Sequence, residues 1–357
     1  MVDFHKGFEG FERLDSSKEG KKEEDLSLSG KQREPEQQVE GLVPSRSDLA
    51  KAEAFYENVL DFVRPLLDKV KEGSESQIKA EEILGWVDEF SDCFRTSIAS
   101  GDLVRLALQH DEYQENYLYT HSVNVCFLAV KVALDLNFTK GKLSELVMAS
   151  LLHDIGMMKI PEHIWNKDGR LTKAENEEVQ KHALYGEEIV RALPGIPEAV
   201  PVIIGQHQER IDGSGYPRHL TKDAIHYGAR LLALIDSYEA QTHTRLWRRR
   251  TLPDRAIQGI LDSESNGYDP HFMKAMLRHI SIFPVGSWVK ISSGDIGMVI
   301  KTNEDTPMRP VISVVMSRDR NRFEEPRMID LSKQFLIHVL ECIDPREIEG
   351  LQGVKTE

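Results

Sequence analysis

Four histidines and two aspartates in the middle of the chain could bind metal ions together. His153 and Asp154 are adjacent, so one turn of backbone supplies two ligands. His207 begins the segment His-Gln-Glu-Arg-Ile-Asp-Gly-Ser-Gly-Tyr-Pro. Imidazole nitrogen and carboxylate oxygen are donors that first-row divalent metals accept in proteins. The candidate metal ligands are His121, His153, Asp154, His182, His207 and Asp236.

Most of these residues interrupt apolar stretches that we predict to be helical. His153 follows Leu-Val-Met-Ala-Ser-Leu-Leu, and Asp236 follows Arg-Leu-Leu-Ala-Leu-Ile. A carboxylate in such surroundings needs a strong partner, because an unpaired buried charge is very costly. One metal ion could satisfy several of these groups at once. Each residue alone would more often be a hydrogen-bonded core side chain or a helix cap, so the prediction rests on their co-occurrence.

Asp154 has two carboxylate oxygens and could bridge two metal ions. Two ions roughly 3.5–4 Å apart can hold a hydroxide between them and also grip phosphate oxygens. Such an arrangement lowers the pKa of water and offsets charge during an in-line displacement at phosphorus. The residues therefore predict metal-dependent hydrolysis of a phosphodiester. The donor set suits Fe, Mn or Zn and does not choose between them.

A glycine loop and a group of arginines could bind the phosphate-containing substrate. Two glycines flank Ser214, so the backbone could approach a ligand closely there. Guanidinium groups suit phosphate and guanine recognition. The alternatives are an ordinary Gly-Pro turn and a solvated helix end. The candidate substrate-binding residues are Gly213, Ser214, Gly215, Tyr216, Arg245 and Arg248.

These segments resemble the HD-GYP family, a branch of the HD phosphohydrolases. The similarity rests on Leu-Leu-His-Asp-Ile-Gly at 151–156, the segment at 207–217 and Asp-Ser-Tyr-Glu-Ala at 236–240. The loop motif is highly specific. The resemblance implies an all-α bundle that uses two divalent metal ions, with Fe or Mn favoured over Zn. It also implies hydrolysis of cyclic di-GMP to linear pGpG, and in some members on to GMP.

The resemblance also assigns roles to particular residues. By motif position, the six candidate ligands would hold the two metal ions, with His153 and Asp154 at the centre of catalysis. Tyr216, Arg245 and Arg248 would lie near the nucleotide. We therefore expect the metal ligands and the substrate-binding residues to share one cavity.

The sequence departs from the family pattern at three positions. Gln208 stands where the family often has a second His, and Tyr117 stands where some members carry Glu. Both departures favour two metal ions without a third. Met157 replaces the usual Lys directly after His-Asp-x-Gly. Lys159 is a candidate for its catalytic role, although a shift of two residues turns a side chain to a different face of a helix.

Composition limits the classes of protein and partner. The chain has 357 residues, of which 40% are hydrophobic, enough for two or three domains with a buried core. A net charge of −14 argues against binding to a nucleic-acid polymer, which needs clustered Lys and Arg. The three widely spaced cysteines are typical of a reducing compartment. We find no signal peptide and no apolar run of membrane-spanning length, so we expect a cytoplasmic protein.

The chain divides into five predicted segments. Residues 1–45 are polar and charged, and we expect them to be disordered. Apolar periodicity predicts an N-terminal helical module at 46–101 and a helical phosphohydrolase domain at 102–282. Short β-branched stretches predict a small β-rich domain at 283–345, which a tail at 346–357 follows. The predicted fold class is mainly α, an HD-type helical bundle with an N-terminal helical module and a small C-terminal β-rich domain.

Three functions remain open at this point. The leading prediction is a cyclic di-GMP phosphodiesterase. The second is a sensor or scaffold that binds cyclic di-GMP without efficient hydrolysis, which Met157 favours. The third is an HD hydrolase for another nucleotide, such as a mixed-base cyclic dinucleotide. The helical module could form a homodimer, and the N-terminal tail could contact a partner protein.

Overall fold

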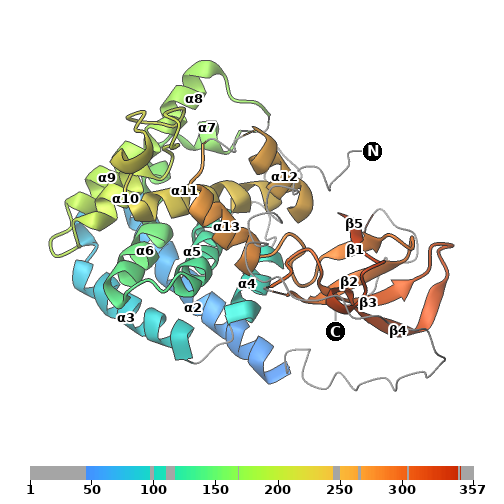
Figure 1. Cartoon of the computed structure of the whole chain (residues 1–357). Helices are drawn as coiled ribbons and strands as arrows, with labels where there is room; N and C mark the ends of the chain where they lie inside the picture. Colours follow the sequence, from blue (N-terminus) through green and yellow to red (C-terminus); the bar gives the residue numbers. More distant parts are fainter. Residues whose placement is uncertain are drawn as a thin grey trace, which may run out of the picture. The chain divides into compact units, whose positions relative to one another are not determined.

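The computed structural model describes residues 46–96, 100–109, 117–167, 169–243, 250–263, 267–303, 305–344 and 346. Residues 43–357 form one compact unit, in which helices precede a sheet (Figure 1). The predicted mainly α fold with a C-terminal β-rich domain is confirmed. The predicted disordered tail and the candidate substrate residues Arg245 and Arg248 lie outside the described residues.

Helices make up most of the described chain up to residue 279. Four short 3₁₀ helices connect or extend the longer elements: η1 (Glu75–Gln77), η2 (Ile155–Lys159), η3 (Lys222–Ala224) and η4 (Leu331–Lys333). The α-helices are α2 (Arg46–Lys71), α3 (Ala80–Thr96), α4 (Ser100–Gln109), α5 (Tyr117–Asp135), α6 (Lys140–Leu152), α7 (Glu162–Trp165), α8 (Lys173–Gln180), α9 (His182–Arg191), α10 (Ala199–Gln206), α11 (Tyr227–Thr242), α12 (Pro253–Ser263) and α13 (Pro270–His279).

Helix α5 forms the centre of the helical part. It contacts α2, α4, α6, α11 and α13 (Figure 1). Among the described residues it is the one helix that is long and apolar enough to span a membrane by composition. Because 78% of its most apolar window is buried inside the fold, α5 has the character of a core helix.

The first two helices pack directly on helices that carry candidate ligands. Helix α2 contacts α5 and η2, and α3 contacts α6. Stacked rings join α2 to α3, with the centroids of Phe62 and Trp86 4.2 Å apart. Phe55 of α2 also stacks on Phe127 of α5, at 6.0 Å. The boundary predicted near residue 101 therefore divides elements that share a core, and it stays a prediction.

One predicted helix is divided in the structure. The sequence predicts a continuous helix over 173–193, whereas α8 ends at Gln180 and α9 begins at His182. The amide of Lys181 bonds to the Glu178 carbonyl three residues back, which tightens the last turn of α8. The break sets the direction in which His182 points.

A five-stranded antiparallel sheet forms the C-terminal domain, in the order β4-β3-β2-β1-β5. Short β-branched stretches at 288–292, 297–302 and 311–317 predict the first three strands, and Gly294-Asp295 between the first two predicts a hairpin turn. Gly294 has the positive φ of such a turn, +89°. The charged strand β4 and the short β5 carry no alternating pattern, and the sequence did not indicate them. The strands are β1 (Trp288–Ile291), β2 (Ile296–Lys301), β3 (Val311–Met316), β4 (Arg322–Asp330) and β5 (Val339–Cys342).

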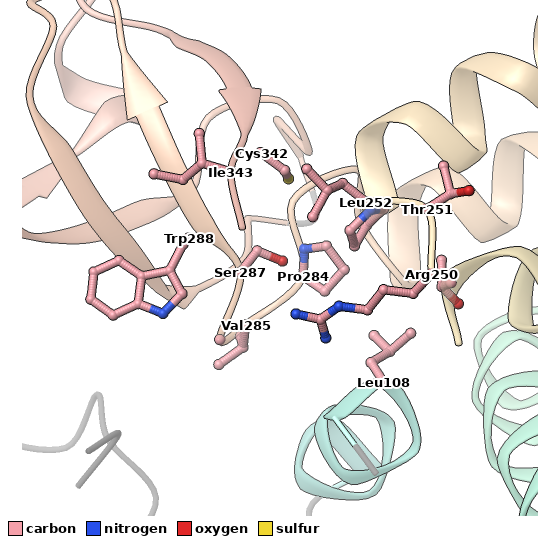
Figure 2. A pocket seen from close by; sticks show the side chains of 13 residues that line it. Leu108, Arg250, Thr251, Leu252, Pro284, Val285, Ser287, Trp288, Cys342 and Ile343 are labelled. Atoms are coloured by element: carbon pink, nitrogen blue, oxygen red, sulfur yellow. The ribbon is translucent and has the colours of Figure 1, made fainter. Parts of the chain in front are cut away.

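Helix α12 anchors the edge strand β5. The buried Asp254 carboxylate accepts from the Cys342 amide at 2.8 Å and from the Arg255 amide at 2.9 Å. Burial raises the pKa of Asp254. A small cavity of about 90 Å³ lies beside this junction, with Arg250 and Trp288 in its wall (Figure 2). None of the six candidate ligands lines it, so the chemistry predicted above belongs elsewhere.

Asp254→Ala is expected to lower the free energy of unfolding by about 1–3 kcal/mol, because the Cys342 amide would lose its acceptor. Chemical denaturation followed by circular dichroism measures the change. Arg255→Ala removes only an exposed ion pair with Glu341 at 3.1 Å and should cost less than about 0.5 kcal/mol. Equal losses in both variants would contradict the anchoring role of Asp254.

Candidate metal centre

The six candidate ligands lie together in one buried cluster, although five helices supply them. Their side chains reach the cluster from helix ends or from the buried faces of core helices. His121 comes from α5, His153 and Asp154 from the junction of α6 and η2, His182 from the start of α9, His207 from the C-cap of α10, and Asp236 from α11.

Asp154 lies between two pairs of histidines. Its Oδ2 is 3.6 Å from Nε2 of His121 and 3.6 Å from Nε2 of His153. Its Oδ1 is 3.4 Å from Nε2 of His182 and 3.8 Å from Nε2 of His207. Within the pairs, the Nε2 atoms are 3.3 Å and 3.2 Å apart. One carboxylate thus presents a separate oxygen to each pair.

Asp236 lies beside the pair formed by His121 and His153. Its Oδ1 is 3.1 Å from Nε2 of His121 and 3.9 Å from Nε2 of His153. Its Oδ2 accepts a hydrogen bond of 2.8 Å from the side-chain amide of Gln208. Gln208, where the family often has His, therefore orients a candidate ligand by donating to it.

Three of the histidines are oriented by their own backbone. The Nδ1 atom of each ring lies within hydrogen-bond distance of the backbone carbonyl three residues earlier. The Nε2 atom of each ring then faces the centre of the cluster, where it could bind a metal ion. For His153, His182 and His207, the acceptors are the carbonyls of Ser150, Val179 and Ile204, at 2.8, 2.6 and 2.6 Å.

The buried carboxylates of the cluster favour binding of cations. Burial alone would raise the pKa values of Asp154 and Asp236, but the surrounding histidines hold both below the ordinary value. Burial would likewise lower the pKa of His121, yet the Glu239 and Asp236 carboxylates raise it to about 10. Burial and two neighbouring imidazoles lower the pKa of His207 to about 3. The imidazole of His207 is therefore neutral, and a neutral imidazole beside buried carboxylates fits a divalent metal ion.

Gly156 lets two ligand-bearing segments meet. A Cβ at this position would lie 2.0 Å from the carbonyl oxygen of His182 and 2.6 Å from the amide nitrogen of Gly186. Both atoms are backbone and cannot move without shifting α9. The glycine after His-Asp-Ile is thus required by the approach of η2 to α9.

Gly156→Ala is expected to displace His182, to weaken metal binding by at least about tenfold and to lower the free energy of unfolding by about 1–3 kcal/mol. Isothermal titration with Mn²⁺ and chemical denaturation measure the two effects. Gly141→Ala is the matched control, because nothing lies within 4 Å of its added Cβ on the helix that leads to His153. If Gly156→Ala bound Mn²⁺ with the parental affinity, the hypothesis that the close approach of η2 to α9 requires glycine at this position would be wrong.

A cavity of about 580 Å³ opens onto the cluster. Met157, Leu118 and Ile164 give it an apolar wall. Arg170 and Arg210 are the described cations in its lining. The ligands that line it are His121, Asp154, His182 and Asp236.

Sequence reasoning missed these two arginines. Arg170 lies in the short loop before α8, and Arg210 lies inside the 207–217 motif itself. The Arg210 guanidinium lies 4.8 Å from the centre of the Tyr268 ring and donates to the Glu209 carbonyl at 3.1 Å. The position of Arg210 in the motif was a signal that could have found it, whereas nothing in the sequence marks Arg170.

The predicted substrate-binding loop reaches the cavity through Tyr216. Its ring lies 6.2 Å from the ring of His182. Gly213, Ser214 and Gly215 are not among the described lining residues. A Cβ on Gly215 would lie 2.3 Å from the amide nitrogen of Arg210, so this glycine serves the close packing of the loop on itself.

Lys159 points away from the cluster. Its ammonium group bonds to Glu75 Oε1 at 2.7 Å, beside η1. Met157, two residues earlier, lines the cavity instead. Tyr117, where some family members carry Glu, stacks on His121 with ring centroids 5.5 Å apart.

Comparison with known proteins gives matches over both domains. Residues 108–272 match the family model of an HD domain, and residues 288–351 match a KOW domain associated with the HD domain. A cyclic di-GMP phosphodiesterase of Pseudomonas aeruginosa is 34% identical over 249 residues, which are 69% of this chain and 58% of that protein.

Two further relatives are more distant. A cyclic di-GMP phosphodiesterase of Borreliella burgdorferi is 24% identical over 205 residues, or 57% of this chain and 54% of that protein. A 3'3'-cGAMP-specific phosphodiesterase of Vibrio cholerae is 30% identical over 168 residues, which are 47% of this chain and 36% of that protein. The chain covers less than two thirds of each of these relatives. With these matches and the ligand cluster, the chain belongs to the HD-GYP family of HD-domain proteins.

Proposed function

We propose that the chain is a metal-dependent phosphodiesterase that hydrolyses cyclic di-GMP to linear pGpG. The observation that carries the proposal is the position of Asp154, between two histidine pairs at the wall of a 580 Å³ cavity. A cavity of this size suits a dinucleotide-sized ligand. The relatives named as cyclic di-GMP phosphodiesterases support the choice of substrate.

We infer that two divalent ions, Fe or Mn rather than Zn, are the cofactors. His121, His153 and Asp236 would hold one ion, and His182 and His207 the other, with Asp154 shared. Such ions, when bound, lower the pKa of water and neutralise phosphate oxygens during displacement at phosphorus.

The chain's own residues bind and orient the nucleotide. Arg170 and Arg210 supply guanidinium groups for the phosphates, the role that the absent lysine leaves open at Met157. The rings of Tyr216 and Trp165 offer stacking surfaces for guanine in the same cavity. The predicted contribution of Arg245 and Arg248 to substrate binding stays a prediction.

Two free, buried thiols, Cys126 and Cys342, are compatible with the reducing cytoplasm that the sequence predicts.

Turnover by the purified full-length chain tests the proposal. The chain is loaded with Mn²⁺ or Fe²⁺ and mixed with cyclic di-GMP, and chromatography separates pGpG from GMP. Metal analysis of the same sample should give two ions per chain. Absence of turnover at every metal loading would overturn the enzymatic proposal.

Met157 favours a second candidate, a cyclic di-GMP sensor with little hydrolysis. Its thioether lines the cavity where the family usually has a lysine ammonium. Tight binding without turnover, together with faster hydrolysis in Met157→Lys, would support this candidate. The similarity to a 3'3'-cGAMP-specific enzyme keeps a mixed-base substrate open. Competition between cyclic dinucleotides in the turnover assay separates these substrates.

A further inference from the structure

His121 is held differently from the other three histidines of the cluster. His153, His182 and His207 bond through Nδ1 to carbonyls of their own helical turns. The Nδ1 of His121 instead contacts Oε2 of Glu239, on α11. The orientation of this one ring therefore depends on tertiary structure rather than on its own backbone.

A chain of buried side chains continues from Glu239 to the N-terminal helix. The Asn124 amide donates to Glu239 Oε1 at 3.0 Å. The Tyr56 hydroxyl of α2 donates to Asn124 Oδ1 at 2.8 Å. His243 also contacts this group, with Nδ1 3.3 Å from Glu239 Oε1. Tyr56, Asn124, Glu239 and His121 are each at most 2% exposed.

We propose that Glu239, Asn124 and Tyr56 are positioning residues that fix His121 for metal binding, and that they make α2 part of the metal centre. The inference rests on the proposed function, because it assumes that His121 binds a metal ion. Helix α2, which carries no candidate ligand, would thus help to set the metal affinity of the centre.

Each link in the chain has a separate physical effect. The Glu239 carboxylate holds the proton on Nδ1 of His121, which leaves Nε2 as the ligand atom and makes it more basic. The Asn124 amide can face Glu239 only through its nitrogen, since its oxygen would meet a carboxylate. The Tyr56 hydroxyl then satisfies the amide oxygen, which would otherwise be buried without a donor.

Metal affinity is the property that distinguishes this role from ordinary core packing. Competition between the full-length chain and a chromogenic chelator for Mn²⁺ measures it without reference to turnover. Glu239→Gln should weaken Mn²⁺ binding by about 10–100-fold. Tyr56→Phe, which removes one hydroxyl, should weaken it by roughly fivefold.

Tyr119→Phe is the matched control. The Tyr119 hydroxyl bonds across the same pair of helices, to Asp68 of α2 at 2.5 Å, but it leads to no candidate ligand. Its loss should leave Mn²⁺ affinity within about twofold of the parent. The unfolding temperature of each metal-free variant shows whether it is folded, and Tyr56→Phe decides the question where Glu239→Gln does not fold.

Two outcomes overturn the inference in different ways. If the parent binds Mn²⁺ and both tyrosine variants bind it equally well, the inference fails and the proposed function stands. If the parent binds no Mn²⁺, the proposed metal centre fails and the inference fails with it.

Discussion

Asp154→Asn is expected to abolish hydrolysis of cyclic di-GMP, with kcat lower by at least about 10³-fold. Asp154 presents one oxygen to each histidine pair, at 3.4–3.8 Å. The asparagine amide can offer its oxygen to one pair but must turn its NH₂ group towards the other. An amide nitrogen is no metal ligand, so we expect metal content to fall from two ions per chain to one.

Turnover and metal analysis on the same preparation check this expectation. Asp223→Asn serves as the control, because its side chain is 98% exposed and forms an ion pair with Arg230, which is not a candidate ligand. It should keep both ions and the parental kcat. Two bound ions and measurable hydrolysis in Asp154→Asn would contradict the assignment of Asp154 as the shared ligand.

Arg170→Ala and Arg210→Ala are each expected to raise KM for cyclic di-GMP by about 10–100-fold, with kcat changed by less than about threefold. A charge-assisted hydrogen bond to phosphate is made in the bound substrate as well as in the transition state, so its loss falls on binding. Arg210 is already held by the Tyr268 ring and the Glu209 carbonyl, which limits the entropy lost on binding.

Steady-state kinetics across substrate concentrations separates KM from kcat. Arg191→Ala is the matched control, since Arg191 lies on α9 with His182 but pairs with Glu187 at 3.0 Å outside the cavity. Its KM should equal that of the parent. A fall in kcat at unchanged KM in the cavity variants would show that the arginines act on the transition state alone.

The grouping of the ligands could be predicted from sequence because most of them lie at an apolar helical stretch; His182, which follows the polar helix α8, is the exception. Buried carboxylates such as Asp154 and Asp236 must find a counter-charge, and imidazoles were the available partners. Strands β1 to β3 were also predictable, because short runs rich in β-branched residues are separated there by Gly- and Pro-containing turn segments. In these cases the local pattern and the tertiary environment require the same structure.

The parts that could not be predicted depend on contacts between distant segments. Glu239 and Asn124 are polar positions inside helical patterns, and nothing in the sequence says that they face one another. Arg170 and Lys159 are both basic residues near the His-Asp motif, yet the turn of η2 carries Lys159 to Glu75. Strand β4 is exposed and charged, so its pairing with β3 gives no periodic signal.

Helices α6 and α10 both end at a ligand, since His153 and His207 are their C-cap residues. The C-terminal end of a helix carries roughly half a negative charge through its unpaired carbonyls. Two such ends add their partial negative charge to that of the buried carboxylates, so we expect phosphate to bind poorly to the metal-free centre. Cyclic di-GMP should therefore bind only after the metal ions, in an ordered sequence, and a chelator should remove nucleotide binding as well as hydrolysis.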